Sequence, residues 1–224
     1  MVEHKEDLWR DYTSALRFWE KLTEEERTVL QRGILPRRMS KGELMHRASS
    51  GCSGIVYVGS GQLRTYIVSE EGREVTLYRV RKGDICVLSA SCLMDAIVFD
   101  VLIEAVEETE ILLLPSTVLN PVMEKNPYVE LYLYKTMTER FSDVMWTMQQ
   151  ILFMGVDRRV ARFLLEEAEH TGSRTLKLTH EEIARYIGSA REVVTKVLNY
   201  FVQEEAVSLG RGKVQITEKL KTYI

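Results

Sequence analysis

The stretch that decides the fold reads LTHEEIARYIGSAREVVTKVLNYFVQE and spans residues 178–204. Two helices that cross at a steep angle need a small residue at the crossing, followed by a turn residue that tolerates positive φ. Ala184 and Gly188 occupy these two places, and Thr179 is positioned to cap the first helix. The stretch therefore predicts a helix-turn-helix unit whose second helix opens at Ser189.

The predicted second helix carries polar side chains that packing does not require. In a helix-turn-helix, the N-terminal half of this helix enters the major groove of DNA, where exposed side chains contact base edges. Arg191 offers donors to guanine, Glu192 accepts from a cytosine amino group, and Lys196 suits a guanine or a phosphate. The alternative, that these charges only solvate an exposed helix face, is disfavoured by the spacing of the small residues and by the hairpin that follows. The predicted DNA contacts are Thr179, Ser189, Arg191, Glu192, Thr195, Lys196, Arg211 and Lys213.

Further elements flank this unit on both sides. A helix is predicted from Asp157 to the glycine at position 172, and the segment AVSLGRGKVQIT forms a hairpin with Gly210 and Gly212 at its tip. Residues 126–152 have helical spacing throughout and predict one helix of about 40 Å. A small roll cannot cover that length, so part of its apolar stripe is expected to meet a second copy of the chain. The stripe comprises Val129, Leu133, Thr136, Arg140, Val144, Met148 and Ile151.

The first half of the chain has a different pattern. Residues 5–34 predict two short helices, and residues 36–115 contain short β-type runs separated by glycine-containing turns. Such regular short strands are typical of an antiparallel roll. The predicted fold is therefore of the α+β class, with N-terminal helices and a sensing β-roll over 1–125, a long dimerisation helix and hinge over 126–154, and a winged helix-turn-helix over 155–224.

Composition sets outer limits on function. The 224 residues are 45% hydrophobic and 28% charged, which is ordinary for a folded protein with two cores. The net charge of -3 excludes a uniformly cationic nucleic-acid coat, but it divides into -5 before Phe153 and +2 from Phe153 onward. No apolar run approaches the roughly 20 residues of a membrane span. Because the start MVEHKEDLWRDY also lacks a secretory signal, we expect a cytoplasmic protein without membrane contact.

The order of these parts and the helix-turn-helix motif resemble the bacterial Crp/Fnr family of transcription regulators. The Ser189-x-Arg191-Glu192 stretch, followed by Lys196, matches the family's S-R-E-T-V-x-R pattern, with valine in place of its threonine and lysine in place of its last arginine. The stretches RMSKGELMHRA and GQLRTYIVSEEGREVTLYRVRKGD also resemble the family's cyclic-nucleotide-binding domain. The resemblance implies a homodimer that binds double-stranded DNA at a two-fold symmetric operator, with half-sites about one helical turn apart. RNA polymerase is an expected partner if the protein is an activator.

Two effectors of that family do not fit this sequence. Its cyclic-AMP-binding members carry an arginine followed by serine or threonine in the phosphate cassette, because a buried cyclic phosphate needs a cationic partner. Here Gly83 and Asp84 lead into ICVLSASCLM, and no arginine lies between Lys82 and Lys125. Cyclic AMP is therefore not expected. An iron-sulfur cluster needs several cysteines near the N-terminus, and none precedes Cys52.

The identity of the effector, and of any cofactor, stays open in the sequence. A small, partly apolar ligand with one anionic group would suit a pocket formed by Gly83, Asp84, Ser89, Ser91, Cys92, Thr136, Met137 and Arg140. A haem is an alternative, with potential axial ligands at His46, Cys52, Cys86, Cys92 and Met94. A third alternative is a redox sensor that responds through oxidation of Cys86 and Cys92. The fourth alternative is that no ligand binds, because Leu88, Leu93 and Met94 fill the pocket. The three cysteines show no zinc-binding pattern, so no metal site is predicted.

Two further expectations complete the prediction. Ligand binding is expected to shift a population of conformers and to re-aim the second domain about a hinge at Gly155. A metal-dependent enzyme on a β-roll would need two or three histidines and a carboxylate at one site. Of the four histidines only His46 lies in the roll region, so catalysis is not expected.

Overall fold

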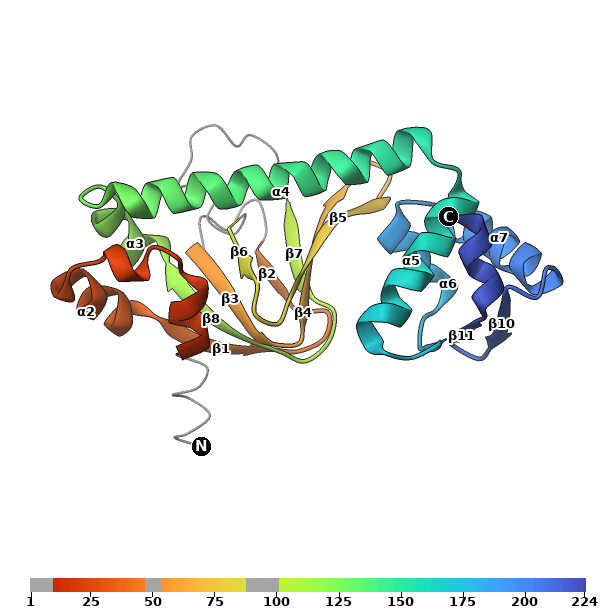
Figure 1. The fold of residues 1–224 in the computed structure, drawn as a ribbon, viewed down its shortest axis with the longest axis horizontal. Helices are drawn as coiled ribbons and strands as arrows, with labels where there is room; N and C mark the ends of the chain where they lie inside the picture. The colour runs from red at the N-terminus through yellow and green to blue at the C-terminus, as the bar shows by residue number, and fades with distance from the viewer. Residues whose placement is uncertain (1–9, 47–53, 88–100) are drawn as a thin grey trace. The chain divides into compact units, whose positions relative to one another are not determined.

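The computed structural model describes residues 10–46, 54–87 and 101–224 of the chain (Figure 1). These residues form two compact units. One comprises residues 10–66 and 77–144, and the other comprises residues 67–76 and 145–224. Each unit has its own buried apolar core, as the length and composition predicted.

The roll of the first unit consists of two four-stranded sheets. The first has the order β1 (Leu35–Met39), β8 (Thr109–Pro115), β3 (Gly54–Ser60), β6 (Ile85–Cys86). The second has the order β2 (Leu44–His46), β7 (Leu102–Ala105), β4 (Gln62–Val68), β5 (Glu74–Arg81). Strands β3 and β8 pair antiparallel from Gly54 opposite Pro115 to Val58 opposite Ile111. The cross-strand partners Ile55 and Leu114 are fully buried, and β3 is buried at consecutive positions from Gly54 to Gly59. The predicted antiparallel roll is confirmed.

Short helices precede and follow the strands. They are helical turns over residues 10–15, η1 (Trp19–Lys21), α2 (Glu24–Gly33) and α3 (Ser116–Met123). Helix α2 begins with a capping box, in which the Thr23 hydroxyl accepts from the Glu26 N–H at 3.2 Å and the Glu26 carboxylate accepts from the Thr23 N–H at 2.8 Å. Leu30 and Leu119 from these helices, and Leu16 just after the first helical turns, are at most 1% exposed and pack into one core cluster with β3 and β8.

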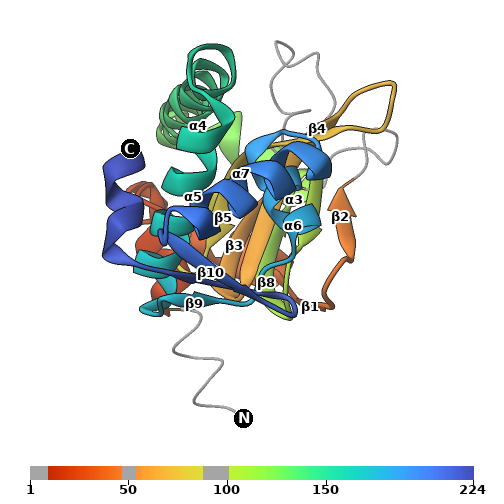
Figure 2. The ribbon, with the colours of Figure 1, turned by 90° about the vertical axis from the view of Figure 1, so that its right-hand side faces the viewer.

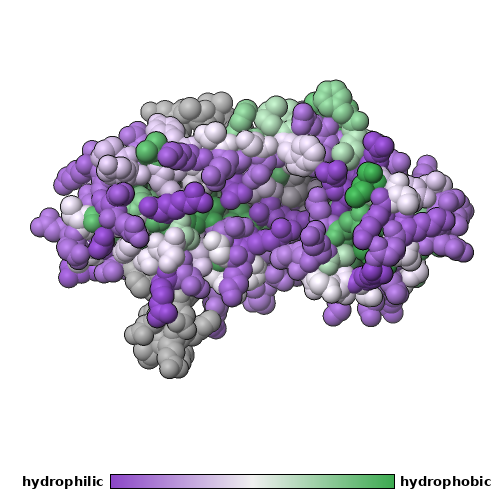
Figure 3. Space-filling model, viewed as in Figure 1, coloured by the Kyte–Doolittle hydropathy of each residue, from purple (hydrophilic) through white to green (hydrophobic). Residues whose placement is uncertain are grey.

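Helix α4 (Pro127–Phe153) is the predicted long helix, and it presents two apolar faces. Val129, Leu133 and Thr136 are buried in the first unit, whereas Met148 is 45% exposed. The predicted stripe therefore packs on the roll in its N-terminal part, and Met148 is the stripe residue that lies on the exposed face. This exposed face carries side chains at alternating spacings of three and four, namely Leu131, Tyr134, Thr138, Phe141, Met145, Met148 and Leu152. Figure 3 shows hydrophobic side chains gathered over the C-terminal half of α4.

From residue 156 onward the second unit contains three α-helices and a small sheet, which Figure 2 shows. Its elements are α5 (Val156–Thr171), β9 (Thr175–Leu176), α6 (His180–Ile187), α7 (Arg191–Gln203), β10 (Val207–Gly210), β11 (Lys213–Ile216) and η4 (Glu218–Tyr223). The sheet order is β10, β11, β9. The predicted winged helix-turn-helix is confirmed, with two helix starts displaced. Helix α5 is capped by Gly155, so Asp157 lies in its first turn, and α7 opens at Arg191 after Ala190, not at Ser189.

Within the described residues, no helix combines the length and the apolar character that crossing a lipid bilayer requires.

Candidate nucleic-acid interface and effector groove

The turn between α6 and α7 has the geometry that its residues predicted. Thr179 caps α6 in a second capping box, with its hydroxyl accepting from the Glu182 N–H at 3.1 Å and the Glu182 carboxylate accepting from the Thr179 N–H at 2.8 Å. Gly188 ends α6 in the left-handed conformation, with φ 64° and ψ 48°. The Ser189 N–H then bonds to the Ala184 carbonyl at 3.0 Å. Because a side chain disfavours this backbone conformation, the turn depends on glycine.

Helix α7 packs on an apolar core. Ile183, Val194 and Leu198 are fully buried, and Ala184 is 3% exposed. A buried arginine of α5 contributes a contact that sequence reasoning missed, since the Arg159 guanidinium donates to the Ile187 carbonyl at 2.6 Å. Burial lowers the pKa of Arg159. Arg159 follows directly on Arg158, and nothing in the sequence indicates which of the two side chains is buried.

The predicted base-reading residues divide into two groups. Arg191, Glu192 and Lys196 are exposed on the first two turns of α7. Thr195 is half-buried, and its hydroxyl lies 2.9 Å from both the Arg191 carbonyl and His180 Nδ1. Ser189 is half-buried in the turn before α7. The exposed group therefore has the freedom to meet DNA, while Thr195 is engaged within the unit.

The wing lies close to the start of both helices. Strands β10 and β11 pair with Gly210 opposite Lys213, and the turn between them contains Arg211 and Gly212, the latter at φ 65°. A groove of about 430 Å³ separates the wing from the helices, and it is lined by Leu178, Thr179, His180, Glu181, Arg191, Gly210, Gly212 and Lys213. Three of the predicted DNA contacts, Thr179, Arg191 and Lys213, therefore meet in one place.

His180 is a lining residue of this groove that the sequence analysis missed. Partial burial and the neighbouring charge of Arg191 lower the pKa of its imidazole. The available signal was its place directly after the cap of α6, where a side chain lies beside the following helix.

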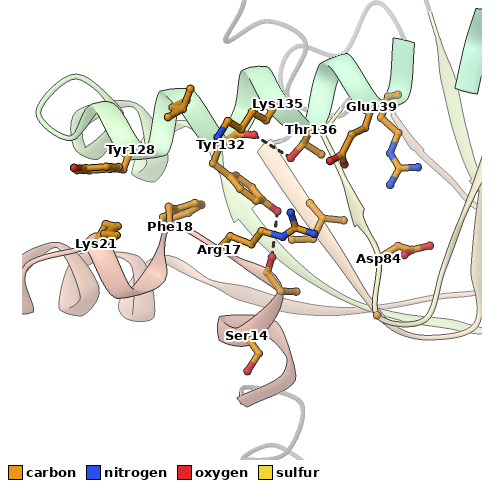
Figure 4. Close-up of a pocket in the computed structure, with 15 residues that line it drawn as sticks. Ser14, Arg17, Phe18, Lys21, Asp84, Tyr128, Tyr132, Lys135, Thr136 and Glu139 are labelled. Carbon is orange, nitrogen blue, oxygen red and sulfur yellow. Dashed lines mark hydrogen bonds between the residues drawn. The ribbon is translucent and has the colours of Figure 1, made fainter. Parts of the chain in front are cut away.

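A second groove, of about 540 Å³, belongs to the first unit (Figure 4). It brings together Gly83, Asp84, Thr136 and Arg140 from the predicted effector pocket. Met137 instead packs against the buried core clusters. Three more predicted pocket residues lie outside the described residues, namely Ser89, Ser91 and Cys92.

Gly83 and Asp84 serve a turn in addition to lining the groove. Gly83 has φ 89°, which a side chain would disfavour, and its N–H bonds to the Val58 carbonyl at 2.8 Å. The Asp84 carboxylate accepts from the Arg81 N–H at 3.1 Å and so closes the turn between β5 and β6. This pair has a structural role that does not require a ligand.

The N-terminal segment forms the opposite wall of the groove, which sequence reasoning missed. In Figure 4 this segment lies below and α4 lies above. The Tyr132 hydroxyl donates to the Ala15 carbonyl at 3.3 Å, and the Phe18 and Tyr132 rings meet edge to face at 5.1 Å. Burial raises the pKa of Tyr132. The charged lining is mainly cationic, with Arg17, Lys21, Lys135 and Arg140 against Asp84 and Glu139.

Arg140 is already engaged in the first unit. Its guanidinium lies 2.8 Å from the Asp143 carboxylate and 5.3 Å from the centroid of the Tyr78 ring. Its Nε is buried and has no hydrogen-bond partner among the described residues. An anionic ligand would therefore compete with Asp143 for this side chain.

The residues suggested for haem or redox sensing are only partly described. Cys86 lies in β6, and its side chain is fully buried. His46 ends β2, while Cys52, Cys92 and Met94 lie outside the described residues. Over the described ranges, no group of three or more histidine, cysteine and acidic side chains is arranged to hold a metal ion.

A β-roll, a long helix and a winged helix-turn-helix with an exposed basic and acidic recognition face define a DNA-binding transcription regulator. Residues 36–126 match the family model of the cyclic nucleotide-binding domain, and residues 158–222 match the Crp-like helix-turn-helix domain. The chain belongs to the Crp/Fnr family of transcription regulators, as its motifs predicted. Members of this family are not enzymes.

Named relatives agree with this assignment. The transcriptional regulator SdrP of Thermus thermophilus is 30% identical over 166 residues, which cover 70% of this chain and 76% of that protein. The transcriptional activator protein Anr of Pseudomonas protegens is 26% identical over 200 residues, which cover 86% of this chain and 80% of that protein. A crystal structure of a Crp/Fnr family regulator from Eubacterium rectale has a TM-score of 0.90 and 42% identity, covering 94% of this chain and 98% of that chain.

Proposed function

We propose that the protein is a homodimeric, sequence-specific transcription regulator of the cytoplasm whose DNA binding is controlled by a small effector other than cyclic AMP. The observation that carries the proposal is the exposure of Arg191, Glu192 and Lys196 on the first two turns of α7, whose other side packs on an apolar core. These side chains supply the donors and acceptors that base edges require. Residues 1–125 sense, 126–154 dimerise and 155–224 bind DNA.

Dimerisation through α4 is supported by its exposed face. Phe141, Met145 and Leu152 are 64%, 42% and 66% exposed, and they belong to a seven-residue repeat that suits a coiled coil with a second copy. A two-fold dimer presents two recognition helices to a symmetric operator. If the regulator activates, its bound dimer also contacts RNA polymerase.

A charge placed on that face tests the dimer. Met145→Glu sets like charges against each other across the proposed interface and is expected to yield monomers with weaker operator binding. Glu130→Gln, on an exposed side of the same helix but outside the repeat, is the matched control. Sedimentation of both variants provides the measurement, and an unchanged dimer in Met145→Glu contradicts this interface.

DNA readout is tested by selecting bound duplexes from random DNA with the purified protein. The expected product is a two-fold symmetric sequence. Arg191→Ala is expected to relax the preference at one base pair of each half-site, because a bidentate arginine contact discriminates by about 1–3 kcal/mol. Arg174→Ala is the matched control, since this exposed arginine of the same unit pairs with Glu218. No enriched sequence, or an unchanged preference in Arg191→Ala, contradicts readout through α7.

We assign the effector to the groove of the first unit, with Gly83, Asp84, Thr136 and Arg140 as contacts. Its cationic lining favours an anionic ligand, and its aromatic rings favour a partly apolar one. Cyclic AMP lacks its usual partner, because residues 83–124 contain no arginine. Ligand binding would shift α4 and re-aim the second unit about Gly155.

Isothermal titration calorimetry tests whether the groove binds cyclic AMP or a different anionic ligand. Cyclic AMP is expected to give no binding heat. Benzoate, as a small anionic aryl probe, is expected to bind the wild type and to bind Arg140→Gln at least about tenfold more weakly. The remaining alternative is a haem or cysteine-based sensor. A Soret band that survives reconstitution and gel filtration would support the haem reading, and its absence would remove it.

Hinge action at Gly155 has a separate test. Gly155 has φ -57°, so Gly155→Ala is compatible with its backbone conformation, although an added Cβ meets the Asp157 carboxylate, which must turn aside. The variant is expected to change the ratio of operator affinities with and without ligand. An identical ratio in the variant and the wild type contradicts the hinge.

A further inference from the structure

His180 connects α6 to the recognition helix through a hydrogen bond of defined polarity. Its Nδ1 lies 2.9 Å from the Thr195 hydroxyl, which lies 2.9 Å from the Arg191 carbonyl. A threonine hydroxyl has one hydrogen, and a carbonyl only accepts. The hydroxyl therefore donates to Arg191 and accepts from His180, so Nδ1 carries the proton of the neutral imidazole. This assignment leaves Nε2 as a lone-pair acceptor.

The groove beside His180 is lined by two cations from different elements. Arg191 enters from α7 and Lys213 from the wing. The acidic lining residue Glu181 is partly compensated, since its carboxylate lies 3.7 Å from Arg185 Nε. Two glycines of the wing, Gly210 and Gly212, also line the groove and add no side chain to it.

The anion that this groove fits is a DNA phosphate. Phosphate contacts fix the register of a DNA-binding unit, and base contacts then read the sequence. The groove includes Arg191, which belongs to the proposed base-reading face, so a bound duplex would place its backbone nearby. His180 lines the groove and its Nδ1 is engaged by Thr195, so Nε2 is the ring nitrogen left to meet a phosphate.

We propose that His180 is a proton-dependent phosphate contact, which takes up a proton from solvent at Nε2 when the DNA backbone enters this groove. The inference rests on the proposed function, because it requires α7 to dock on DNA. A neutral Nε2 presents a lone pair to an anion, which is repulsive. A protonated Nε2 donates a charge-assisted hydrogen bond to the same anion.

The direction of the pH effect follows from the charges around the ring. In the free protein, partial burial and Arg191 lower the pKa of His180, and Lys213 acts in the same direction as Arg191, while Glu181 opposes them. A phosphate neutralises the cations and raises the pKa. The complex therefore binds more protons than its separate parts, and affinity rises as pH falls. The gain vanishes above the pKa of the complex and is complete below that of the free protein.

Proton uptake on binding is the direct test. Full-length protein is titrated with the duplex enriched by selection, at about pH 7, in buffers of different ionisation enthalpy. The wild type is expected to take up as many as about two protons per dimer, and each unit of pKa gained raises affinity about tenfold per half-site. His180→Gln keeps an amide donor for Thr195 but does not titrate, so it is expected to lose the uptake. His170→Gln, at an exposed position in the last turn of α5, is expected to keep it.

A second variant and a second duplex distinguish the contact from indirect effects. His180→Arg carries a permanent charge, so its affinity is expected to be independent of pH and its salt slope to increase by about one per protomer at high pH. A random-sequence duplex at low salt is expected to give the same uptake as the selected one, because phosphates are common to both.

The outcomes separate cleanly. Uptake that persists in His180→Gln, or binding of wild type without uptake, overturns the role of His180 and leaves the proposed function standing. Uptake confined to the selected duplex overturns the phosphate assignment. If the wild type binds neither the selected duplex nor the random-sequence duplex, both this inference and the proposed function are overturned.

Discussion

The proposed recognition face and the proposed effector groove are assembled in opposite ways. The face lies on α6 and α7, within 24 consecutive residues from His180 to Gln203. The groove takes its walls from residues 14–21, 83–85 and 128–140, which are far apart in the chain. A local motif is fixed by its own turn and core, whereas a groove built from distant segments depends on how those segments dock. The two regions should therefore respond differently to mutation.

The largest effect is expected from the core of the second unit. Phe201 is fully buried and its ring lies 4.7 Å from that of Tyr223, so Phe201→Ala should destabilise this unit by about 3–5 kcal/mol. Tyr200→Ala, at a 45% exposed neighbour, should cost far less. Thermal unfolding with tryptophan fluorescence and limited proteolysis provides the measurement. Simultaneous loss of the roll in Phe201→Ala would show that the two regions do not fold separately.

A smaller effect is expected at the turn between α6 and α7. Gly188→Ala forces a side chain into the left-handed conformation, at a cost of about 1–2 kcal/mol. Gly172→Ala meets the same strain, at φ 63°, after α5 and with no atom near the added Cβ. Both variants should lose similar stability in denaturant unfolding, but only Gly188→Ala should weaken operator binding. Equal binding losses would mean that the turn does not orient α7.

The docking of the N-terminal segment on α4 depends on weaker contacts. Tyr132→Phe removes the hydroxyl that donates to the Ala15 carbonyl and should cost about 0.5–1.5 kcal/mol. Tyr134→Phe is the matched control, since Tyr134 is 53% exposed on the opposite face of α4. Hydrogen exchange should become faster over residues 10–21 in the first variant only, while operator selection stays unchanged.

The smallest effect concerns the acid stability of the α2 cap. Burial alone would raise the pKa of Glu26, but hydrogen bonds from Thr23 and Asn126 outweigh it and lower the pKa. The folded state therefore holds the carboxylate ionised, and this stabilisation is present above the ordinary pKa and lost as pH falls through the lowered value. Glu26→Gln should thus lose little stability at acidic pH relative to wild type and more near neutrality. A pH-independent difference in melting temperature would contradict this linkage.

Sequence reasoning succeeded where the determinants are local. Ala184 and Gly188 predicted the turn, Thr179 predicted the cap, and the glycines of the wing predicted its hairpin. The helix start at Ser189 was displaced because Ala190 lies extended before α7. These features depend on backbone preferences of residues close in sequence, which one chain is enough to reveal.

Sequence reasoning failed where one helix is apolar on two sides and where segments distant in the chain pack together. Helix α4 is apolar on two sides, so spacing alone did not distinguish the face covered by the roll from the exposed face with Phe141 and Met145. Arg17 and Lys21 gave no sign that they line a groove with α4, because that contact depends on long-range docking. His180 was missed because its hydrogen bond to Thr195 spans two helices.

Helix α4 also has a mechanical consequence. Residues 128–153 contain neither glycine nor proline, the usual causes of a kink, so the helix should move as a stiff rod of about 40 Å. A tilt of about 5° at the groove would then displace the far end near Phe153 by about 3.5 Å. A small ligand in the groove would in this way move the C-terminal end of α4 by slightly more than the length of one hydrogen bond.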